Sequence, residues 1–140
     1  MTRTSDNENP GLYRRGDIAK ENNSQLLVSI HNNALPDGHD PYTEHGSSTY
    51  YYHPQSLPLA KSIQQSMVQN LGLKDYGIFW DSLALTRPNT QLSVLVEVGF
   101  MIHPYEYVLL VNPDFQKKAA KSIYLGIEKF YENQAQTPRS

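Results

Sequence analysis

Two residues whose side chains can take part in catalysis or metal binding lie within or next to apolar stretches of this sequence. His31 directly follows the run Leu26 to Ile30, and Glu97 interrupts the run Val94 to Phe100. A carboxylate that is buried without a partner is costly, so Glu97 must meet a cation, a metal ion or good hydrogen-bond donors, or else keep its proton. A carboxyl group with a raised pKa is suited to general base catalysis.

Both residues also have a structural interpretation. Glu97 could pair with a basic residue such as Arg87, and His31 could be a satisfied histidine at a strand end, because structural ion pairs often perturb pKa values. Arg87 could instead contact carboxylates of a substrate. The residues alone favour the structural interpretation for His31 and Glu97, and they do not decide the role of Arg87.

Other histidines offer a second possible metal site. His39, Glu44 and His45 lie in a segment without periodicity, and His53 and His103 follow further on. Imidazole and carboxylate groups could form a metal site there, but a flexible loop does not fix the geometry of ligands. We therefore expect these side chains to be exposed polar groups and His103, which precedes a proline, to cap a helix.

The elements that must position these residues alternate along the chain. The expected helices cover residues 10–24, 57–72, 105–110 and 113–131, and the expected strands cover residues 26–30, 47–53, 83–86 and 94–100. A turn is expected near residues 75–77. Tyr50, Tyr51 and Tyr52 could stack on sugar rings, but aromatic residues are good strand formers, and packing is their expected role. This order predicts an α/β domain with a mixed, mostly parallel sheet flanked by helices, in which ligands gather at the carboxyl ends of strands.

Composition narrows the possible partners. The 140 residues carry a formal net charge of −2, with a pI near 6.2, so no basic excess favours a nucleic acid. Without cysteine, any metal must be held by histidine and carboxylate groups. No apolar run approaches a membrane span, and no export signal is recognisable. We expect one domain over residues 1–132 and a disordered tail over 133–140.

The two apolar stretches, taken together, resemble a known family. The segments Leu27-Val28-Ser29-Ile30-His31-Asn32-Asn33-Ala34 and Val94-Leu95-Val96-Glu97-Val98-Gly99-Phe100 resemble motifs of the zinc-dependent N-acetylmuramoyl-L-alanine amidases of type 3. These enzymes cleave peptidoglycan between N-acetylmuramic acid and L-alanine. The pieces between and around the motifs also fit, so the resemblance covers nearly the whole chain, and two motifs at the expected separation are more specific than either alone.

The resemblance implies roles for both residues. His31 would be a zinc ligand, and Glu97 would be the catalytic carboxylate close to the metal. Zinc with an open coordination position lowers the pKa of its bound water and polarises the scissile carbonyl. The implied partner is peptidoglycan, and the implied location is periplasmic or extracellular.

One departure from the family pattern bears on activity. By the resemblance, a histidine and a glutamate upstream of this chain would complete the three-ligand zinc set, and the sheet would be truncated at its N-terminal side. We therefore expect the isolated chain to bind zinc weakly and to be impaired. The alternatives are a non-catalytic module that binds peptidoglycan or a partner, and a truncated product without an independent role.

Overall fold

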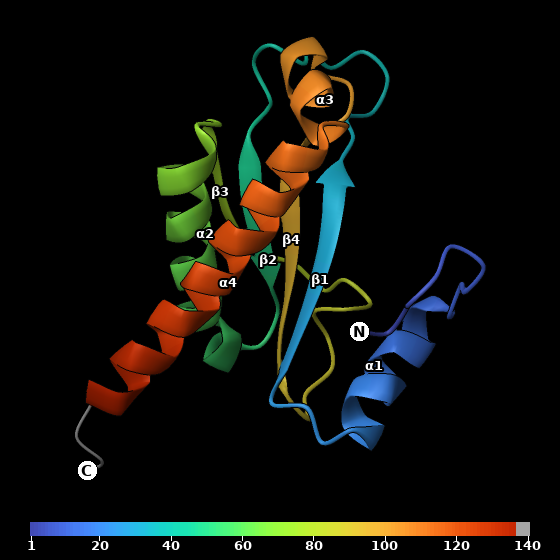
Figure 1. Cartoon of the computed structure of the whole chain (residues 1–140), viewed down its shortest axis with the longest axis vertical. Helices are drawn as coiled ribbons and strands as arrows, with labels where there is room; N and C mark the ends of the chain where they lie inside the picture. Colours follow the sequence, from blue (N-terminus) through green and yellow to red (C-terminus); the bar gives the residue numbers. More distant parts are fainter. Residues whose placement is uncertain (137–140) are drawn as a thin grey trace.

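A four-stranded mixed sheet forms the centre of the molecule, in a computed structural model that describes residues 1–136 (Figure 1). The strands are β1 (Leu26–Asn33), β2 (Ser47–Tyr51), β3 (Asp75–Trp80) and β4 (Leu92–Phe100), in the spatial order β1-β4-β2-β3. The pairs β1–β4 and β2–β3 are parallel, whereas β2 and β4 are antiparallel. The predicted α/β class with a mixed, mostly parallel sheet is confirmed.

Two helices cover one face of this sheet (Figure 1). They are α2 (Leu57–Leu71), which follows the short 3-10 turn η1 (Pro54–Ser56), and α4 (Pro113–Gln136). Alternate residues of β4 point into the core beneath them: Val94, Val96 and Val98. Because β4 is central and these side chains are buried, Leu95 and Glu97 must point to the opposite face of the sheet.

The opposite face is more open. Helix α1 (Leu12–Glu21) lies on this side, where its Ala19 packs with Leu27 of β1 and with Leu85 of a loop. A cavity of about 730 Å³ separates α1 from β1 and is lined by residues of both, including Arg15 and His31. Strand β1 is at the edge of the sheet and pairs only with β4 among the described residues.

Two predictions for residues 75–86 were wrong. Residues 83–86 form no strand but a turn, in which the Thr86 hydroxyl accepts from the backbone N–H of Leu83 and donates to the carbonyl of Asp81. The strand is instead β3, where we expected a turn. Gly77 adopts a φ of +124°, so it resembled a turn residue, but pairing with β2 holds the segment extended.

Helix ends agree more closely with the sequence. Gly72 ends α2 with a left-handed φ of 75°, and the His103 side chain accepts from the backbone N–H of Glu106 as the cap of α3 (Pro104–Leu110). Helix α4 runs past residue 131 to Gln136, so residues 133–136 of the expected tail are helical. The rest of that tail, residues 137–140, lies outside the described residues.

Candidate active site

His31 and Glu97 are neighbours on adjacent parallel strands. They are register partners in the β1–β4 ladder, near the carboxyl end of each strand. Residues paired in this way point to the same side of a sheet. Leu27, four residues before His31 and therefore on the same face of β1, packs on the α1 side. The structure therefore brings the two predicted residues together on one face.

Within residues 1–136, the carboxyl group of Glu97 has no charged partner. Its Oε2 atom is buried and forms no hydrogen bond with any described residue. Burial raises the pKa of Glu97 from 4.5 to about 7. Among the ion pairs of the described residues none includes Glu97, so the structural interpretation in which it pairs with Arg87 is wrong.

The imidazole of His31 is exposed and held by a short contact along its own strand. Its Nε2 atom lies 2.7 Å from the hydroxyl oxygen of Ser29. Although the residue is exposed, its neighbours remove part of the solvation of the ring, which lowers the pKa of His31, and the positive charge of Arg15 on α1 lowers it further. Both effects favour the neutral ring, which is the form that binds metal ions.

Strand β2 brings Tyr50 to the same place, although packing was the role favoured for the three tyrosines over stacking on sugar rings. Ser48 is the register partner of Glu97, and Tyr50, two residues on, shares its face of the sheet. Burial raises the pKa of Tyr50, the side chain of Asn33 opposes the rise, and the charge of Glu97 adds to it. Because three consecutive tyrosines occur in this strand, the sequence did not indicate which ring would point to this face of the sheet.

Arg87 lies elsewhere. One of its guanidinium nitrogens is 3.4 Å from the hydroxyl oxygen of Tyr13 on α1, and its backbone carbonyl accepts from the ring of His53. It lines a hollow together with residues of α1 and of the loop before β4, and neither His31 nor Glu97 lines that hollow.

A second group of potential ligands comes together at the other histidines. His45, His103 and Glu106 have possible ligand atoms within 4.8 Å of one another. However, the two rings are stacked with centroids 4.4 Å apart, and His103 Nδ1 accepts from a backbone N–H. The buried Glu106 carboxylate accepts from the backbone N–H of Phe100 at 2.7 Å and from His45 Nδ1 at 2.8 Å.

This group is therefore a hydrogen-bonded network that ties the loop before β2 to the end of β4. His103 is 7% exposed, so the expectation of an exposed side chain was wrong for this residue. The prediction that it caps a helix is confirmed. Glu106 gave no signal in the sequence, because its partner His45 is distant along the chain.

The raised pKa of Glu97 predicts a pH-dependent effect of its removal on stability. The folded protein holds this proton up to about pH 7, whereas the unfolded chain releases it near 4.5, so burial of Glu97 destabilises the fold increasingly as the pH rises between these values. The melting temperature of Glu97→Gln, relative to that of the wild type, should therefore rise between about pH 4 and about pH 8. Thermal melts across this range check the trend, and a constant difference would contradict it.

Comparison with known proteins gives a consistent result. Residues 1–129 match the N-acetylmuramoyl-L-alanine amidase family. The chain is 33% identical, over 94% of its length, to an uncharacterized cell wall amidase of Bacillus anthracis, and 30% identical, over 91%, to the germination-specific N-acetylmuramoyl-L-alanine amidase of Bacillus subtilis. It spans 26% and 53% of the lengths of these two relatives.

The fold gives the same match. The crystal structure of an N-acetylmuramoyl-L-alanine amidase from Clostridium difficile superimposes with a TM-score of 0.84 at 28% identity, over 94% of this chain and 70% of that one. The catalytic domain of such an amidase from Paenibacillus polymyxa gives a TM-score of 0.83 at 29% identity.

Among the described residues, no helix is long and apolar enough to cross a membrane.

Proposed function

Because the chain belongs to the N-acetylmuramoyl-L-alanine amidase family, we propose that it serves in hydrolysis of the amide bond between N-acetylmuramic acid and L-alanine of peptidoglycan. The names of its relatives support action at the cell wall, outside the cytoplasm. The observation that carries the proposal is the pairing of His31 with Glu97 on one open face of the sheet, with a buried oxygen of Glu97 left without a partner.

Glu97 has the properties of a general base that later acts as an acid. An oxygen without a protein partner is available to accept a proton from water, and a pKa of about 7 lets the carboxyl group give that proton to the leaving nitrogen of L-alanine. A general acid–base group of this kind contributes about 100- to 10,000-fold to a rate. Tyr50 and Asn33 border the same space, so they are candidates to orient the attacked carbonyl.

The residues around Glu97 fit a zinc site in part. His31 offers a neutral imidazole and Glu97 an unpartnered carboxylate oxygen. A catalytic zinc takes three protein ligands, and the one close group of three ligating side chains among the described residues includes neither His31 nor Glu97. When bound, zinc would supply polarisation of the carbonyl and of a water. His31 would then be one ligand.

Zinc binding should therefore be weak in the isolated chain. We expect a dissociation constant above the micromolar range by isothermal titration, because one histidine and one carboxylate do not hold zinc tightly. A fusion that adds the part of the Bacillus subtilis germination-specific amidase that this chain does not match should bind more tightly. In that fusion His31→Ala should weaken binding by more than about 100-fold, since loss of even an outer-shell partner of a ligand costs 10- to 100-fold.

The matched control is His39→Ala. His39 is an exposed histidine that pairs with Glu44 on the loop, so its removal should leave zinc affinity unchanged. Submicromolar, one-to-one binding by the isolated chain would show that these residues suffice for the site. Equal effects of the two substitutions would remove His31 from it.

Digestion of purified peptidoglycan tests the function itself. Cleavage of the proposed bond releases stem peptides with a free L-alanine amino group, which mass spectrometry identifies. The chain and the fusion are compared, each with zinc and with a chelator. Zinc-dependent release by the fusion supports the amidase, whereas chelator-insensitive retention on the wall with no released peptide in either form supports a binding module instead.

The role of Arg87 in substrate binding stays a prediction. Its contact with Tyr13, and its position in a hollow that lacks His31 and Glu97, favour a role in holding α1. If Arg87 binds the stem peptide, Arg87→Ala raises KM in the digestion assay more than it lowers kcat.

A further inference from the structure

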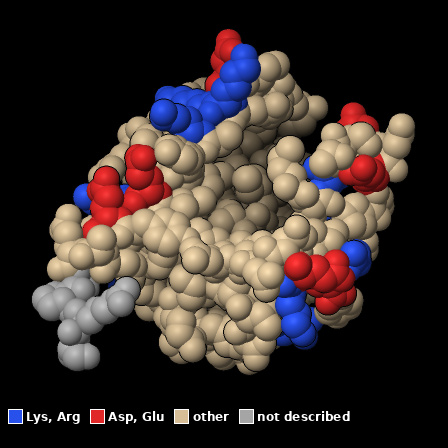
Figure 2. Space-filling view, turned by 60° about the horizontal axis from the view of Figure 1, so that its bottom comes forward, with Lys and Arg blue, Asp and Glu red and all other residues tan. Residues whose placement is uncertain are grey.

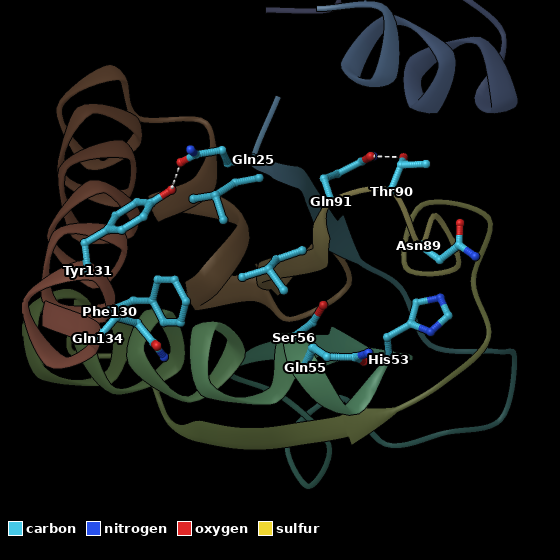
Figure 3. A pocket seen from close by; sticks show the side chains of 12 residues that line it. Gln25, His53, Gln55, Ser56, Asn89, Thr90, Gln91, Phe130, Tyr131 and Gln134 are labelled. Atoms are coloured by element: carbon cyan, nitrogen blue, oxygen red, sulfur yellow. Dashed lines mark hydrogen bonds between the residues drawn. The ribbon is translucent and has the colours of Figure 1, made fainter. Parts of the chain in front are cut away.

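A second cavity lies at the end of the molecule opposite the His31–Glu97 site, near the first residues of β1 and β4. It has a volume of about 500 Å³, within the range of small-molecule pockets. Its walls come from the residues before β1 and β4, from η1, and from the last turns of α4 (Figure 3). These segments are distant in the sequence, so the cavity is a product of the fold.

The walls are rich in amides and carry one imidazole, that of His53, whose Nε2 atom lies 2.7 Å from the backbone carbonyl oxygen of Arg87. No Lys, Arg, Asp or Glu lines this cavity. Figure 2, in which the bottom of the view in Figure 1 comes forward, shows the Lys, Arg, Asp and Glu side chains of that face in separate groups near its periphery, with uncharged residues between them. Five amide side chains line it instead: Gln25, Gln55, Asn89, Gln91 and Gln134. A charged ligand would find no carboxylate, ammonium or guanidinium group as a counter-charge here, which favours a neutral ligand.

The floor and one wall are apolar. Leu26, Leu92 and Phe130 belong to the core or pack against it, and they line the cavity from below. Beside them the ring of Tyr131 is 43% exposed, and its hydroxyl donates to the Oε1 atom of Gln25 at 3.1 Å (Figure 3). An exposed ring next to hydrogen-bonding amides offers one apolar surface and one polar edge.

One amide in the wall is buried and incompletely bonded. Gln91 is 8% exposed, its Oε1 atom accepts from the hydroxyl of Thr90, and its Nε2 atom has no partner among the described residues. Burying a donor without an acceptor is costly, so such a group indicates a ligand acceptor. The exposed amides of Gln55, Asn89 and Gln134 also have no hydrogen bond to a described side chain or backbone group.

We propose that this cavity binds a neutral, N-acetylated sugar of the glycan strand, at a distance from the bond that is cleaved. Sugar hydroxyls both donate and accept, so amides match them, and the less polar face of a sugar ring packs on an aromatic ring. The acetamido methyl group would meet the floor of Leu26, Leu92 and Phe130, and its carbonyl would accept from Gln91. This role as a glycan anchor rests on the proposed function.

The test is a titration of ¹⁵N-labelled chain with triacetylchitotriose, followed by NMR. We expect shifts at the side-chain amide of Gln91 and at the backbone around residues 89–92 and 130–134. Tyr131→Ala should weaken binding by about tenfold, the effect of losing one aromatic stacking contact. Gln55→Ala, an exposed residue whose loss does not disturb the core, should also weaken it.

Controls separate the sugar from other ligands. Tyr107→Ala removes an exposed tyrosine of α3 and should leave affinity unchanged. Cellotriose, which lacks acetamido groups, should bind more weakly than triacetylchitotriose. A neutral peptide, N-acetyl-dialanine amide, should cause no shift at Gln91. Stronger shifts with the peptide, no shifts with triacetylchitotriose, or equal affinity of Tyr131→Ala and the wild type would each overturn the proposal.

This experiment is independent of catalysis. It needs neither zinc nor the Glu97 carboxylate, so Glu97→Gln should bind triacetylchitotriose as the wild type does. Loss of peptide release with intact sugar binding would count against the proposed function only. Peptide release without sugar binding would count against the glycan anchor only.

Discussion

Replacing Glu97 with glutamine is expected to reduce kcat/KM for release of stem peptides by about 100- to 10,000-fold. Glutamine has nearly the same shape as glutamate but cannot accept and return a proton. The carboxyl group has no ion-pair partner among residues 1–136, so its loss breaks no salt bridge described there and the fold should persist. The assay is the zinc-supplemented digestion of peptidoglycan by the fusion described above.

The control is Glu132→Gln, which removes an exposed carboxylate of α4 and should leave kcat/KM unchanged. Circular dichroism and a melting curve establish that both variants are folded. If Glu97→Gln keeps more than about a tenth of the wild-type rate, Glu97 is not the general base.

The pKa of Glu97 gives a second readout of the same role. Burial raises it to about 7 without a metal, and a zinc ion at His31 would lower it, because a nearby positive charge favours the carboxylate. Titration of the ¹³C-labelled side chain by NMR should therefore show a lower pKa in the zinc-loaded fusion than in the metal-free one. An unchanged value would place the metal away from Glu97.

Replacing Gly126 with alanine should destabilise the fold by at least about 2 kcal/mol. A Cβ atom at Gly126 would lie 2.5 Å from the Cα atom of Ile63 and 3.0 Å from the backbone carbonyl oxygen of Ser62. Helices α2 and α4 cross closely here, and one helix turn away the Ser66 hydroxyl donates to the carbonyl of Ser122 at 2.7 Å. The added methyl group must push the two backbones apart and open the core between them.

A second helical glycine supplies the matched control. Gly16 in α1 has only the Cγ atom of Pro88 within reach of an added Cβ, at 3.4 Å. Gly16→Ala should be neutral or should stabilise the protein by up to about 1 kcal/mol, because alanine favours a helix over glycine. We expect melting temperatures that fall by about 6 to 10 °C for Gly126→Ala and do not fall for Gly16→Ala. Equal changes in the two variants would mean that the helix crossing tolerates a side chain.

Part of the site could be predicted from the sequence because its signals are local. A continuous apolar run predicts a buried strand, so His31 and Glu97 stood out as polar residues in such runs. The helices α2 and α4 followed from apolar residues at helical spacing, and Gly72 and His103 marked helix ends through backbone preferences that depend on near neighbours. These features need no knowledge of the rest of the chain.

Strand β3 shows where local signals fail. Asp75 and Gly77 are turn-forming residues, and the positive φ of Gly77 agrees with that preference. The segment is nevertheless a strand because β2 offers it a parallel partner. The energy of that pairing comes from residues that local sequence patterns do not connect with it.

The sequence by itself determined the types of residue at the site and the strands that carry them. Only the tertiary structure decided that His31 and Glu97 are register partners on one face, that Arg87 does not neutralise Glu97, and that Tyr50 borders the same space. A run that is apolar at every position does not reveal which side chains face which way, since the usual alternation is missing. Pairing between β1 and β4, which are distant in the chain, fixes both the register and the face.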